Sequence, residues 1–183
     1  MIFKAGFSEE MVSQLAAMKG KTFKSYECTS LGTWGYADGI VRINLGRYAV
    51  DITCDLHALE EPGGYDEMTW LSCSVVPLKS DFIARIDSEP RQYMVNEVIT
   101  GVELVRDRVS DRRDDSVIVM DMAVVIRTKY HTFTLSRDVS FDDTIAVDVS
   151  DAGSPPGGIG PIGKVWPESE DGTVGVSRET LTL

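Results

Sequence analysis

Cysteine and histidine are scarce in this sequence, which has three of the first and two of the second. Cys28, Cys54 and Cys73 are odd in number and lack paired spacing, which argues against a disulfide framework. The N-terminal stretch lacks the apolar run of a signal peptide. Together these absences predict a reducing compartment, the cytoplasm.

Long hydrophobic runs are absent as well. The most apolar stretch, 116–129, is interrupted by Asp121. It is also shorter than the roughly 20 residues that a helix needs to span a bilayer. The sequence therefore predicts a soluble protein without a membrane association.

Basic residues are in deficit, because the formal net charge at pH 7 is −11. Residues 138–183 hold nine acidic residues against Lys164 and Arg178, a net of −7. Such a field repels phosphate backbones, so nucleic acid is not expected as a partner. It attracts a basic partner, and it also keeps an acidic protein in solution.

Helical periodicity is found in two short stretches. In the first, Ser8 is placed to cap a helix, two glutamates favour its first turn, and Gly20 ends it. A second, weaker helix is predicted between Ser80 and Pro90. Both are expected to pack an apolar face on the rest of the protein.

Elsewhere apolar residues alternate with polar ones, as in strands with one solvated face. Strands are predicted near 23–28, 41–45, 48–54, 67–76, 95–105, 116–127, 130–137 and 144–149. The charged stretches 55–67 and 106–115 are predicted to be loops. The pattern is therefore a helix and four strands, followed by a helix and four strands.

These elements predict a mainly β protein of the α+β class, with antiparallel meanders forming a barrel or a strongly curved sheet. One β-rich domain is expected over residues 1–150. The similar hairpins 39–53 and 123–137 suggest that 1–78 and 79–150 are an internal duplication, although β-meanders resemble one another whatever their origin.

Residues 151–183 form a Pro/Gly-rich, acidic C-terminal extension. The extension is expected to dock on the domain or on a neighbouring chain. Trp166 is the predicted anchor, because large aromatic side chains dominate such contacts.

A phosphate-binding loop is suggested by Gly158–Val165, which matches G-x-x-x-x-G-K. Val165 stands where a serine or threonine holds magnesium, and Pro161 removes one backbone amide. No alternating βαβ pattern surrounds the run. The match is therefore attributed to a glycine-rich linker, and no cofactor is expected.

Cys54 and His57 have the spacing of half a zinc site, and the other half is missing. A cysteine on a strand is usually a small buried apolar residue. No metal is therefore expected, and no serine or cysteine nucleophile with an oriented base is apparent.

Two functions remain open at this point. The favoured one is a non-enzymatic binding or protein-interaction domain, whose acidic surface and Trp166 engage a basic protein or a second copy in a homodimer. The alternative is a small-molecule-binding barrel or an enzyme. The residues predicted to line its mouth are Trp34, Tyr36, His57, Tyr65 and His131. The layout resembles that of small β-rich bacterial proteins, and no single motif carries the resemblance.

Overall fold

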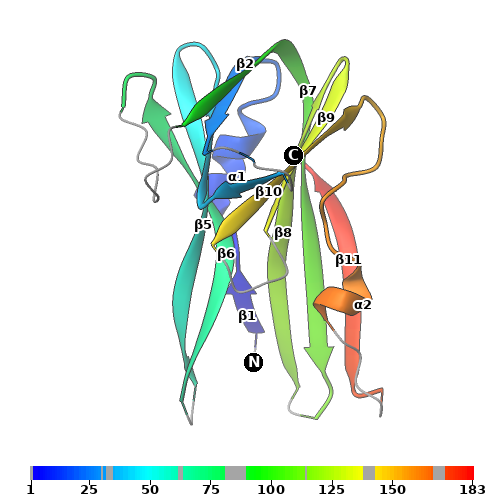
Figure 1. Ribbon diagram of the computed structural model, residues 1–183. Helices are drawn as coiled ribbons and strands as arrows, with labels where there is room; N and C mark the ends of the chain where they lie inside the picture. Colours follow the sequence, from blue (N-terminus) through cyan, green and yellow to red (C-terminus); the bar gives the residue numbers. More distant parts are fainter. Residues whose placement is uncertain are drawn as a thin grey trace.

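The computed structural model describes residues 2–29, 31, 35–61, 64–80, 90–113, 115–137, 143–166 and 172–183, with only the backbone of 58–61 and 64–67. Within these ranges the protein is mainly antiparallel β sheet with two short helices (Figure 1). The helices are α1 (Glu9–Ala16) and α2 (Ile162–Val165). The strands are β1 (Ile2–Ala5), β2 (Thr22–Cys28), β3 (Tyr36–Asp38), β4 (Ile40–Asn44), β5 (Tyr48–Glu61), β6 (Gly64–Pro77), β7 (Arg91–Asp111), β8 (Ser116–Thr128), β9 (His131–Arg137), β10 (Thr144–Asp151) and β11 (Val174–Thr182).

Helix α1 begins as its sequence predicts. The Ser8 side chain accepts a hydrogen bond from the Met11 amide, at 3.3 Å, which satisfies one of the free donors of the first turn. Leu15 is fully buried, and with Met18 it belongs to the main core. The second predicted helix falls on 81–89, which lie outside the described residues.

The described strands form a single sheet, in the order β3-β10-β9-β8-β7-β2-β4-β5-β6. The ends of this path, β3 and β6, do not pair with each other, so the sheet is open and the predicted barrel closure is not confirmed. β1 joins β8 in parallel, an exception to the antiparallel pattern that the sequence predicts. β11 joins β7.

Strands β2 and β7 pair antiparallel at the middle of this order. Outward from them lie β4, β5 and β6 on one side, and β8, β9 and β10 on the other. Two repeats of four strands would produce this order if they met at their first strands. The internal duplication nevertheless stays a prediction, because strand order alone does not relate the two halves by descent.

Two hairpins are much longer than the sequence pattern suggests. β5 and β6 stay paired as far as Glu61 and Gly64, and β7 pairs with β8 as far as Asp111. The predicted loops at 55–67 and 106–115 are therefore wrong over 55–61, 64–67 and 106–111, which are strand, while 112, 113 and 115 lie in the turn between β7 and β8. Figure 1 shows both hairpins pointing the same way, beyond the part of the sheet that packs on α1. In β7, charged residues of this stretch are either exposed, as Arg108 is, or paired, as Asp107 is with Arg178.

Strand β7 is the central element of the structure, because three strands pair with it. Its first part pairs with β2, and its later part pairs with β8 on one edge and with β11 on the other. The described part of the chain contains no helix long and apolar enough to cross a membrane.

Candidate binding groove

Four strands surround an open groove on the sheet. It has a volume of about 480 Å³. β2, β7, β9 and β10 supply its lining residues, which are Tyr26, Gln92, Tyr93, Met94, Val95, Glu97, His131, Phe133 and Val149. Such a volume lies within the roughly 300–1,000 Å³ of typical ligand sites.

His131 is the one predicted mouth residue that the structure places in this groove. Tyr36, on β3, and His57, on β5, do not line it. His57 instead stacks on Trp70, with the ring centroids 3.5 Å apart and the planes 2° from parallel. Trp34 and the side chain of Tyr65 lie outside the described residues.

A β-bulge in β7 shapes one end of the groove. Phe23 of β2 faces Glu97, but Ser25 already faces Met94, so β7 carries one extra residue there. Asn96 lies in this bulge and has a φ of 58°. Asparagine tolerates this left-handed conformation better than most residues do. A bulge changes the direction of the side chains beside it, and Glu97 is the residue directly after Asn96.

The Glu97 carboxylate ties β7 to the turn between β8 and β9. Its Oε2 accepts hydrogen bonds from the Thr128 hydroxyl at 2.5 Å and from the Tyr130 amide at 3.4 Å. Its Oε1 lies 2.7 Å from Nδ1 of His131. The side chain of Glu97 is 11% exposed and that of His131 is 42% exposed, so the pair borders on solvent.

These contacts hold Glu97 in its ionised form. Burial acts to raise its pKa, but the hydrogen bonds from Thr128 and His131, together with the charge of His131, outweigh burial and lower the pKa of Glu97 below 4.5. An ionised carboxylate can only accept hydrogen bonds, so Nδ1 of His131 must be the donor. In the neutral imidazole, Nε2 is then an acceptor.

Replacing Glu97 by glutamine is expected to lower the free energy of unfolding at neutral pH by about 1–2 kcal/mol, because charge-assisted hydrogen bonds are lost. The pKa of Glu97 is lower in the folded protein, so its stabilisation is present above 4.5 and disappears as the pH falls below that value. Urea unfolding of both proteins across this range measures the difference. A difference that stays constant down to strongly acid pH would contradict the role given to the charge.

Aromatic side chains form the wall of the groove. Tyr26 and Tyr93 stack with ring centroids 4.7 Å apart and planes 12° from parallel. Phe133 packs against Tyr26 edge to face and lies 5.8 Å from the His131 ring. Burial first, and then the neighbouring Cys28 and Tyr93, raise the pKa of Tyr26 to about 12, so its hydroxyl stays protonated. The groove thus offers ring surfaces and one fixed negative charge.

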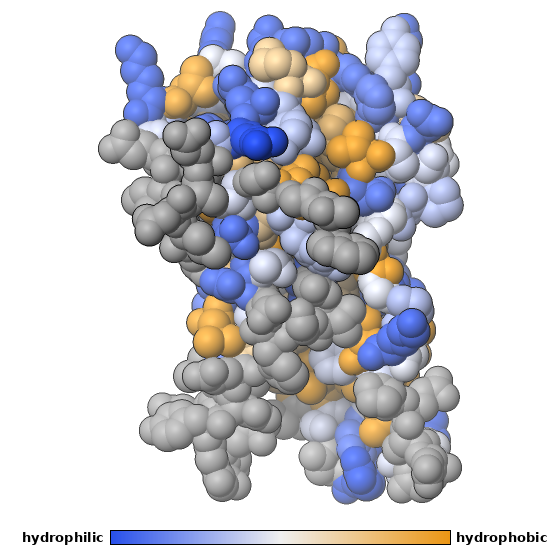
Figure 2. Space-filling model, in the orientation of Figure 1, coloured by the Kyte–Doolittle hydropathy of each residue, from blue (hydrophilic) through white to orange (hydrophobic). Residues whose placement is uncertain are grey.

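The rim of the groove is apolar and exposed. Met94 is 65% exposed and Val149 is 45% exposed, and in the adjoining β8–β9 turn Tyr130 is 57% exposed. Figure 2 shows apolar side chains mixed with polar ones on the face that it draws. Apolar atoms at the edge of a concave site commonly mark a contact surface.

A second hollow, of about 350 Å³, lies between β1, the start of α1 and the end of β11. Its charged floor is already paired, since Asp121 accepts hydrogen bonds from Arg106 at 2.7 Å and from the Phe7 amide at 3.0 Å. Both interactions join separate elements of the fold. This arrangement is that of a structural ion pair, and the groove is the better candidate site.

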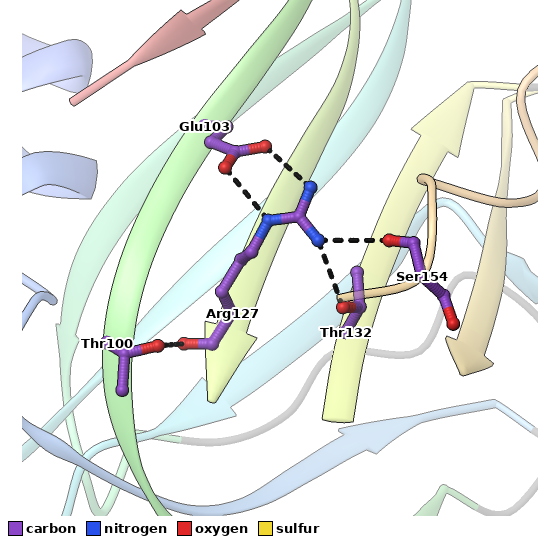
Figure 3. Close-up of polar contacts among 5 residues, drawn as sticks. All are labelled: Thr100, Glu103, Arg127, Thr132 and Ser154. Carbon is purple, nitrogen blue, oxygen red and sulfur yellow. Dashed lines mark hydrogen bonds and ion pairs between the residues drawn. The ribbon is translucent and has the colours of Figure 1, made fainter. Parts of the chain in front are cut away.

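The C-terminal extension docks on its own chain. Trp166 donates a hydrogen bond from Nε1 to Asp107 at 2.9 Å, and Arg178 donates two to the same carboxylate, at 2.6 and 2.8 Å. Figure 3 shows a further attachment, in which Arg127 binds Glu103 and the backbone carbonyl of Ser154. Trp166 therefore contacts β7 within the protein, away from the groove.

The run that resembles a phosphate-binding loop belongs to this attachment. The carbonyl of Gly158 accepts a hydrogen bond from the Ser136 hydroxyl, and that of Gly160 accepts one from Arg178. In a phosphate loop the backbone amides converge on the ligand. Here the glycine carbonyls bind the side chains beneath them, as expected for a linker that lies on the sheet.

All three cysteines are buried and stand outside any disulfide bond. Burial raises the pKa of Cys28 and Cys73 to about 12, and that of Cys54 to about 11, so their thiols are poor nucleophiles and poor metal ligands. Among the side chains that the structure describes, no group of three or more His, Cys, Asp or Glu residues is placed to hold a metal ion.

Sequence reasoning missed most of the groove. Tyr26, Tyr93, Glu97 and Phe133 come from strands that are far apart in the chain, and no short motif contains them. The one available signal was an ordinary strand pattern. Such a pattern predicts which face of the strand a side chain lies on, and it does not predict which other strand lies beside it. No protein-family model, curated protein or solved structure matches the chain.

Proposed function

We propose that this protein is a non-enzymatic interaction domain, and that the groove over β7 and β9 is its contact surface for a basic partner protein. The observation that carries the proposal is the ionised Glu97 at one end of an open aromatic groove. Aromatic ring faces and a nearby carboxylate both attract cations.

Charge supports a basic partner. The chain has a formal net charge of −11, so its field favours the approach of a positively charged surface. The exposed rim supports a protein over a small cation, because Met94 and Tyr130 extend the apolar contact beyond the groove itself. A second copy of the chain is the alternative partner, although its own negative charge opposes it.

A small organic cation is the second candidate ligand, because the groove has the volume of a ligand site. This candidate retains the sequence-based expectation of a small-molecule binder. His131 is the residue that the predicted ligand site and the groove share. As for its surroundings, three cysteines outside any disulfide bond support a reducing compartment such as the cytoplasm.

The test is a titration of the protein with a short oligoarginine peptide at neutral pH and low salt, in which calorimetry measures the binding. Met94→Lys places a positive charge on the groove rim, and Leu56→Lys places the same charge on β5, where Leu56 is 49% exposed and away from the groove. Met94→Lys is expected to weaken binding roughly threefold to tenfold relative to Leu56→Lys.

Equal weakening in the two variants would contradict the proposal, since it would mean that only net charge matters. If Met94→Lys weakened the binding of a small organic cation and left peptide binding unchanged, the result would favour the second candidate. Sedimentation of the free protein tests the second copy, whose association Met94→Lys would disrupt.

A further inference from the structure

His131 carries an unused acceptor in the groove. Glu97 accepts a hydrogen bond from the Nδ1–H group of His131, so Nε2 of the neutral ring bears a lone pair. None of the described residues donates a hydrogen bond to it, and the side chain is 42% exposed. A ligand that lies beside His131 therefore gains from offering an N–H or O–H donor.

Glu97 itself has little capacity left for a direct contact. Its two oxygens already accept from Thr128, Tyr130 and His131. A cation in the groove thus feels the charge of the carboxylate without displacing these donors. The ligand has to find its hydrogen-bond acceptor at His131 and its packing surface elsewhere.

Tyr93 supplies that packing surface. Tyr26 stacks on Tyr93 and holds it in place, and Tyr93 lines the groove together with His131. A ring fixed in this way loses little side-chain entropy when a flat group packs against it.

We infer that the group recognised in the groove is the guanidinium of an arginine side chain, which packs on Tyr93 and donates an N–H to Nε2 of His131. The inference rests on the proposed function and specifies its partner. Arginine fits better than lysine, because its guanidinium is planar, stacks on aromatic rings and is weakly hydrated. Lysine carries a compact, strongly hydrated charge that gains less from a ring face.

The experiment compares blocked arginine and blocked lysine, each as the N-acetyl methylamide, by NMR titration of the ¹⁵N-labelled protein. Arginine is expected to bind roughly threefold to tenfold more tightly and to shift the His131 and Tyr93 signals. Tyr93→Leu is expected to abolish most of this preference. Tyr36→Leu is the matched control, because Tyr36 is an exposed tyrosine outside the groove, and it is expected to leave the preference unchanged.

The ring nitrogens of His131 give an independent readout that does not depend on a ligand. The neutral ring in the free protein is expected to be the Nδ1–H tautomer, and Glu97→Gln is expected to change the tautomer balance. A ring protonated at Nε2 in the free protein, either as the Nε2–H tautomer or as the imidazolium, would overturn the inference. Equal binding of arginine and lysine that Tyr93→Leu leaves unchanged would also overturn it, while oligoarginine binding that depends on Met94 would keep the proposed function standing.

Discussion

Replacing Arg178 by methionine is expected to lower the free energy of unfolding by about 3–5 kcal/mol, because it leaves a buried carboxylate without its charge partner. The side chain of Asp107 is 0% exposed. Arg178 supplies two of its hydrogen bonds, at 2.6 and 2.8 Å, and Trp166 supplies the third described one. Methionine fills similar space without replacing either donor.

Chemical denaturation of the purified variant measures this loss. Arg108→Met is the matched control, because Arg108 is an exposed residue opposite Ser177 of β11, and it is expected to change stability by less than about 0.5 kcal/mol. The double variant Asp107→Asn/Arg178→Met is expected to be more stable than Arg178→Met alone, since the unpaired charge is gone. A double variant that is less stable by the sum of both losses would contradict this explanation.

Replacing Gly6 by alanine is expected to destabilise the protein by about 3 kcal/mol, from overpacking and backbone strain together. The added Cβ would lie 2.5 Å from Oδ2 of Asp121, and the φ of Gly6 is +146°. Asp121 cannot move aside cheaply, because Arg106 and the Phe7 amide hold its carboxylate. Thermal unfolding is the measurement.

Gly157 offers a control with a similar clash but a mobile neighbour. A Cβ there would clash with the Asp148 carboxylate. The structure describes no hydrogen bond to that carboxylate, so it can rotate away. Gly157→Ala is therefore expected to cost less than about 1 kcal/mol. A loss in Gly157→Ala as large as in Gly6→Ala would show that close approach alone, without a fixed neighbour, decides the cost.

Local patterns predicted the local features of the fold. The Ser8 cap, the start of helix α1 and the paired strands β4 and β5 follow from residues within one short window of sequence. These predictions are confirmed because capping and strand alternation depend on near neighbours. Strand ends were predicted less well, since the charged ends of β5 and β7 look like loops until the partner strand is known.

Non-local pairing explains the rest of what the sequence did not reveal. β1 is a four-residue strand that pairs with β8 more than a hundred positions away, and nothing in its own residues marks it as a strand. The groove also depends on non-local pairing. Glu97 lies beside a bulge in β7 and His131 lies after the β8–β9 turn, and the folded structure brings the two into contact. Strand register decides which residues the groove brings together, and a single sequence does not specify that register.

The three-way pairing of β7 has a consequence for how the chain reaches this structure. Its edge from Glu103 to Asp111 pairs with β11, whose residues Val174 to Thr182 are made much later. At a synthesis rate of about 5–20 residues per second, that edge remains open for several seconds on the ribosome. An open strand edge recruits other chains. The concentration of nascent chains, and not only final stability, is therefore expected to govern the yield of folded protein.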